Sequence, residues 1–171
     1  MPSEDLIARL ARQIDAAKRN EQFIIDASET AALRARGAAE LHALCATFVA
    51  NVNSRLSEAV LELAPPVYAP DRFREQGIHL IQISAQGRAM LLAFHAPREP
   101  VATEKFRIPY VLEGEIRTFN QQMLQRFEVR TQLLFYCVEN GEAHWRYSDF
   151  RTLRTGLLTH EFLAELMEKL F

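Results

Sequence analysis

The spacing of proline residues constrains this chain more than any other feature of its sequence. After Pro2 the next proline is Pro65, which Pro66 follows directly, and the stretch between is rich in Ala, Leu, Glu and Arg. Proline breaks a helix interior because it lacks a backbone donor and its ring clashes with the preceding turn. The gap therefore permits one very long helix, or two joined helices, over the first third of the chain.

An apolar stripe runs through this stretch. Apolar or small residues recur at alternating steps of three and four, the spacing of a seam between helices. This set of positions, called the apolar frame below, consists of Ile7, Leu10, Ile14, Ala17, Ile24, Ala31, Ala35, Ala38, Cys45, Val49, Val52, Leu56, Ala59 and Leu63. We predict that Ile7, Leu10, Ile14 and Ile24 form a protein–protein seam. From Leu41 onward a second row through Leu44 and Phe48 widens the stripe, as in a helix that also covers a sheet.

The length of this helical segment favours association. An unbroken helix from Ser3 to Leu63 would be ~90 Å long, whereas a compact chain of this size has a radius of gyration of only ~15 Å. A continuous or kinked helix would protrude and need a partner chain. The alternative is an intramolecular helical pair, with a capping box at 26–29 or a break at Gly37, although neither place has the turn residues of a helical hairpin.

The pattern of the remaining residues predicts an antiparallel sheet followed by a helix. Gln86-Gly87 and Asn140-Gly141 predict two tight hairpins, the second carrying the strongest short hairpin signal. Gly114 predicts a turn, and Pro109 predicts an edge strand or a bulge. The predicted strands cover 78–84, 89–96, 106–112, 115–120, 129–138 and 143–150, followed by a helix over 159–171 with Thr159 as its N-cap.

The order of these elements predicts the α+β class. We expect a long, kinked or continuous N-terminal helix, an antiparallel sheet of about five to six strands and a C-terminal helix. The helical segment, residues 1–64, would serve oligomerisation or docking, and residues 71–171 would form the body. The two helices are expected to cover opposite faces of the sheet.

Composition and motifs exclude several function classes. The formal net charge of -2 gives no general attraction for nucleic acid or an anionic membrane. The first residues lack a secretory signal, no apolar run is long enough to span a bilayer, and Cys45 and Cys137 suit a reduced, cytoplasmic protein. The five histidines lack metal-binding spacing, the glycines form no phosphate cradle, and Glu113 and Glu115 would be solvated beside a turn. No metal or other cofactor is predicted.

The segment from His144 to Gly156 is the most distinctive in the chain. It interleaves aromatic side chains with Arg146, Arg151 and Arg154, a composition found at protein interfaces and at anion sites. If Asn140-Gly141 forms the turn, Tyr136 opposes Trp145 and Leu134 opposes Tyr147. Tyr136, Trp145 and Tyr147 would then line a ligand pocket, which Arg146 or His144 could enter only if the sheet bulges.

The same register makes Cys137 a cross-strand neighbour of His144. A Cys–His pair could generate a reactive thiolate, but we identify no third orienting group, so a thiol enzyme or hydrolase ranks last among three hypotheses. We predict a non-enzymatic cytoplasmic interaction or scaffold protein that self-associates through its N-terminal helix, as a homodimer or with a helical protein partner. The alternative is a small-ligand-binding domain.

Overall fold

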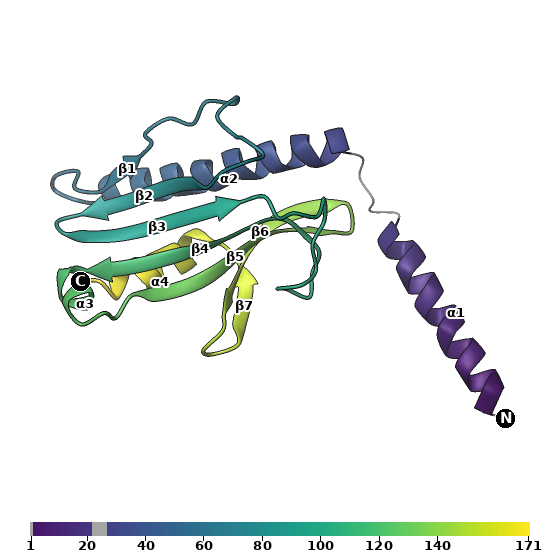
Figure 1. The fold of residues 1–171 in the computed structure, drawn as a ribbon. Coiled ribbons are helices and arrows are strands. Elements are labelled where there is room, and N and C mark those ends of the chain that lie inside the picture. Colours follow the sequence, from purple (N-terminus) through teal and green to yellow (C-terminus); the bar gives the residue numbers. More distant parts are fainter. Residues whose placement is uncertain (1, 22–26) are drawn as a thin grey trace.

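The computed structural model describes residues 2–21 and 27–171 of the 171-residue chain, and within them the side chains of residues 5–16 and 28–171. The described part contains four helices and seven strands in an α+β arrangement (Figure 1). In chain order these are α1 (Pro2–Glu21), α2 (Ala27–Asn53), β1 (Glu62–Ala64), β2 (His79–Ala85), β3 (Arg88–His95), β4 (Tyr110–Asn120), α3 (Gln121–Gln125), β5 (Arg130–Glu139), β6 (Glu142–Asp149), β7 (Arg154–Leu157) and α4 (His160–Glu168).

The strands form one antiparallel meander in the order β1 to β7. The α+β class is confirmed, whereas the expected five to six strands are too few. The prediction missed β1 and β7, which have three and four residues. Strands this short show too little alternation to be recognised from sequence.

Both predicted hairpins are confirmed. Gln86-Gly87 and Asn140-Gly141 have positive φ at both residues, as a two-residue hairpin turn requires. Ile81 pairs with Leu92, and Tyr136 pairs with Trp145, as the turn positions predict.

The turn predicted at Gly114 is wrong, because this residue lies inside the continuous strand β4. A Cβ atom at Gly114 would lie 2.0 Å from the carbonyl oxygen of Ala93, so glycine permits a close approach to β3 here rather than a change of direction. The bulge suggested by Pro109 is present next to it, as a register shift between Tyr110 and Leu112.

The apolar face of the sheet is covered by α2 and α4 together, not by one helix on each face as expected. One core cluster contains Leu41 and Phe48 of α2, Leu163 of α4, and Ile83 and Leu92 of the sheet. The predicted N-cap of α4 is confirmed, since the Thr159 hydroxyl accepts a hydrogen bond from Phe162 N at 3.2 Å. On the other face, the loop 96–109 returns over the sheet and packs Phe106 on Phe135.

The prediction that the helical frame continues to Leu63 is also wrong, because α2 ends at Asn53. The Asn53 side chain accepts from the backbone N of Val60 and of Leu61 and donates to the Leu61 carbonyl. These three bonds organise the turn that leads into β1. Whether α1 and α2 are continuous or kinked falls on residues 22–26, outside the described residues.

Candidate functional site

The apolar face of α1 is exposed. Every residue from 5 to 16 is exposed, and α1 lies apart from the sheet (Figure 1). The large apolar side chains of this face have exposed fractions of 48–67%: Leu6, Ile7, Leu10 and Ile14. Three of them belong to the predicted seam, whose fourth member, Ile24, lies outside the described residues. Leu6 was missed, although its spacing of four residues from Leu10 and of eight from Ile14 marks the same face.

The α2 part of the apolar frame has a different role. Ala38, Cys45 and Val49 are buried in the core that α2 shares with the sheet. The frame of small and apolar residues therefore divides at the boundary between the two helices. Of the two helical parts, the described side chains of α1 are the ones left without a covering surface.

The aromatic residues predicted to line a pocket are packed beneath the helices. Tyr136, Trp145 and Tyr147 are at most 6% exposed. Trp145 Nε1 donates to the Gly37 carbonyl at 2.7 Å, and the Tyr136 hydroxyl donates to Glu40 at 2.8 Å. Tyr147 stacks on Phe162 of α4 at 3.6 Å between ring centroids. The three side chains do share a face, but α2 and α4 fill the space in front of them.

The three predicted arginine contacts are dispersed. The β5–β6 ladder is regular and needs no bulge, so Arg146 lies on the opposite face from Trp145 and pairs with Glu139 at 3.2 Å. Arg154 pairs with Glu165 of α4 at 3.5 Å, and Arg151 is exposed in the turn between β6 and β7. The structure does not bring these guanidinium groups to one anion site.

Cys137 and His144 are register partners, as predicted. The thiol contacts the Phe135 carbonyl at 3.7 Å, whereas His144 pairs with Glu142. Burial, the largest cause, raises the pKa of Cys137 to about 12, and burial raises that of Cys45 to about 12. Both thiols are therefore protonated near neutral pH, which opposes formation of the thiolate that nucleophilic chemistry needs.

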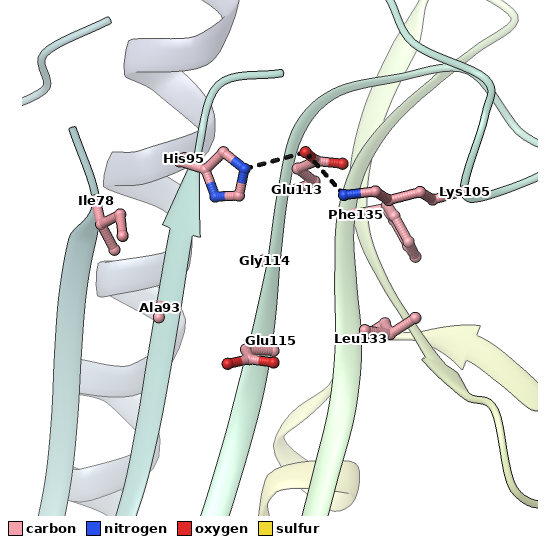
Figure 2. Close-up of a pocket in the computed structure, with 9 residues that line it drawn as sticks. All are labelled: Ile78, Ala93, His95, Lys105, Glu113, Gly114, Glu115, Leu133 and Phe135. Carbon is pink, nitrogen blue, oxygen red and sulfur yellow. Dashed lines mark hydrogen bonds and ion pairs between the residues drawn. The ribbon is translucent and has the colours of Figure 1, made fainter. Parts of the chain in front are cut away.

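A pocket of about 310 Å³ opens on the face of the sheet that carries the loop 96–109 (Figure 2). Its floor is mainly apolar, and its polar side chains come from β3, β4 and the loop. The lining residues are Ile78, Ala93, His95, Lys105, Glu113, Gly114, Glu115, Leu133 and Phe135. An apolar floor with a few convergent polar groups is the usual make-up of a small-molecule site.

Glu113 is the central polar group of this pocket. Its Oε1 accepts from His95 Nε2 at 3.0 Å and from Lys105 Nζ at 3.4 Å (Figure 2). The Glu113 side chain is only 11% exposed, whereas that of Lys105 is 61% exposed. Glu115 points from the same strand and pairs with Arg117. Both carboxylates are thus held by solvent-exposed cations that can move away at little cost.

A second concave surface lies between the C-terminal end of α2 and α4. This α2–α4 groove has a volume of about 600 Å³ and includes Phe48, Val52, Leu56, Leu61, Met167 and Phe171 in its lining. Leu56 and Phe171 are exposed there, at 42% and 67%. Sequence reasoning missed the groove because it assigned Leu56 to a continuous helical seam.

Residues 2–21 and 27–171 contain neither a cluster of metal-ligating side chains nor a membrane-spanning helix. No three His, Cys, Asp or Glu side chains converge as a metal site would require, and none of the described helices has the length and apolarity to cross a bilayer. Comparison of the chain with known protein families, with curated proteins and with solved structures gave no match in any of the three.

Proposed function

We propose that this protein is a non-enzymatic interaction or scaffold protein that self-associates through α1. The exposed face of α1 carries this proposal, because Leu6, Ile7, Leu10 and Ile14 lie within about three turns of one helix. An amphipathic helix of this length is only marginally stable alone in water, and packing of its apolar face normally supplies the missing stability. A second copy of the chain could supply this packing, because every copy carries the same exposed apolar surface.

The charge pattern of α1 agrees with a protein partner. The helix contains four acidic residues, Glu4, Asp5, Asp15 and Glu21, and four basic ones, Arg9, Arg12, Lys18 and Arg19, so its formal charges cancel. A helix that binds anionic lipid surfaces instead carries an excess of Lys and Arg on its polar face. Self-association is therefore favoured over adsorption to a membrane.

We expect the double variant Leu10→Gln/Ile14→Gln to weaken self-association at least about a hundredfold, since each buried Leu or Ile side chain contributes about 1.5–3 kcal/mol and each chain loses two. Glutamine keeps good helix propensity, so the change acts on the apolar face rather than on helix formation. Sedimentation equilibrium over a range of concentrations measures the association constant.

The matched control is Arg12→Gln, which changes the opposite face of the same helix. It should leave the association constant nearly unchanged. Equal association of the wild-type chain, the control and the double variant would exclude α1 as the interface.

A second candidate function, binding of a small organic ligand, is favoured by the Glu113 pocket. We propose a ligand with a primary ammonium group and a short apolar chain. The ammonium would take the place of Lys105 at Glu113, and the chain would lie on Ala93 and Leu133. Two carboxylates, Glu113 and Glu115, line the pocket, and the lysine that contacts Glu113 is 61% exposed and can move aside, so a cation is favoured over an anion.

Substitutions of Glu113 and of Lys105 should change the affinity for the ligand in opposite directions. With n-hexylamine as the probe, Glu113→Gln should lose binding at least about tenfold, because it removes the charged acceptor. Lys105→Met should tighten binding roughly two- to fivefold, because an exposed competing ion pair is worth up to about 1 kcal/mol. Calorimetric titration measures both, with hexanoate as the control ligand. Binding of hexanoate that depends on Lys105 would refute the cation site.

A further inference from the structure

Two of the exposed apolar surfaces in the described part of the chain are candidates for contact with each other. The face of α1 is convex and carries Leu6, Ile7, Leu10 and Ile14, and the α2–α4 groove is concave and lined by Leu56, Phe171 and their neighbours. Large contiguous exposed apolar patches usually mark interaction sites on soluble proteins. A helix whose apolar residues are spaced by three and four docks readily into a groove of this kind.

The groove of the same chain is difficult for α1 to reach. Phe48 and Val52 lie about 32 and 38 Å along α2 from Ala27, at 1.5 Å per residue. Leu10 lies about 17 Å from the end of α1, and the six chain steps from Glu21 to Ala27 span at most about 20 Å. The middle of α1 thus meets its own groove only if those steps are fully extended. A second copy has no such restriction.

Pairing of α1 with α1 would leave part of the apolar surface uncovered. The helix has 20 residues, fewer than three full heptads, and its described side chains include only four large apolar ones. A two-stranded coil this short is marginal, and it would leave both grooves exposed to water. If two copies exchanged their α1 helices, both α1 faces and both α2–α4 grooves would be covered. The resulting interface would be symmetric.

We propose that α1 of one copy docks into the α2–α4 groove of a second copy, so that two chains exchange their N-terminal helices. This inference rests on the proposed self-association through α1 and adds the surface that receives the helix. In this arrangement Ala11, one turn after Ile7 at the flank of the apolar face, lies at the edge of the contact, and Glu168 belongs to the lining of the partner's groove.

Cross-linking between introduced cysteines tests this arrangement. Ala11→Cys and Glu168→Cys change exposed positions and keep the apolar residues of both surfaces. The native thiols do not interfere, since Cys45 and Cys137 are buried. Full-length chains carrying one change each are mixed, equilibrated and treated with a short bis-maleimide. We expect the Ala11→Cys and Glu168→Cys chains to form a covalent heterodimer several-fold faster than an Arg12→Cys chain, changed on the face of α1 opposite Leu10, forms one with the Glu168→Cys chain.

The outcomes separate this inference from the proposal on which it rests. If the chains associate but Ala11→Cys links to itself and not to Glu168→Cys, the helices pair with each other, and the exchange is refuted while self-association stands. If a chain carrying both changes links internally at monomer mass, the helix occupies its own groove, and the exchange is refuted. If the wild-type chain remains monomeric, both proposals are refuted.

Discussion

Gly37→Ala should destabilise the protein by about 1–3 kcal/mol, although alanine is the better helix former. A Cβ atom at this position would lie 2.5 Å from Cδ2 and 2.6 Å from Cε2 of Tyr136. Relief of this clash moves α2 away from the sheet and strains the hydrogen bond from Trp145 to the Gly37 carbonyl. Overpacking costs about 1–3 kcal/mol and a lost hydrogen bond about 1 kcal/mol, against about 1 kcal/mol gained in helix propensity.

Denaturant unfolding of two further variants isolates the clash from helix propensity. Ala39→Gly, on the exposed side of α2, should cost only about 1 kcal/mol. In a double-mutant cycle, Tyr136→Leu should reduce the penalty of Gly37→Ala, because leucine vacates the space that the new methyl needs. A Gly37→Ala protein as stable as wild type would show that α2 does not pack on Tyr136 this closely.

Arg34→Lys should destabilise the protein by about 3 kcal/mol. The Arg34 guanidinium is nearly buried and donates to the Val111 carbonyl at 2.9 Å, to Glu75 at 2.6 Å, and to the Glu99 and Pro100 carbonyls at 3.0 and 3.2 Å. It joins α2 to β4 and to the loop that covers the Glu113 pocket. A lysine ammonium is a single point charge and cannot donate to acceptors in so many directions, so the buried Val111 carbonyl or the partly buried carbonyls of Glu99 and Pro100 would lose their donor.

The comparison variant is Glu75→Gln, which removes the charge of one partner only. The Glu75 side chain is 44% exposed, so water replaces the lost interaction and the cost should stay near 1 kcal/mol or below. Thermal and urea unfolding give both values. Equal costs for the two variants would mean that the ion pair, rather than the carbonyl contacts, is the main contribution of Arg34.

Local turn chemistry explains which parts of the sheet could be predicted from sequence. Asn140-Gly141 and Gln86-Gly87 specify two-residue turns, and each turn fixes the pairing of the strands on either side. Thr159 followed by an apolar face similarly marks the start of α4. These signals act within a few residues, and all three predictions are confirmed.

The other features depend on contacts between distant segments. The end of α2 is set by the Asn53 side chain bonding to residues 60 and 61, in a stretch without proline or glycine to signal it. Glu113 was expected to be solvated beside a turn at Gly114, but β4 runs straight through that glycine and the loop 96–109 covers the carboxylate. Sequence periodicity showed that α2 and α4 each have an apolar face, but not that both faces pack on the same side of the sheet.

The exposed face of α1 leads to the central claim, that this helix is covered by a second copy of the chain. Sedimentation equilibrium of the full-length wild-type protein tests it most directly. We predict that the weight-average mass rises with concentration from that of the 19.6 kDa chain to twice that value. A mass that stays at one chain across the whole concentration range would contradict the claim.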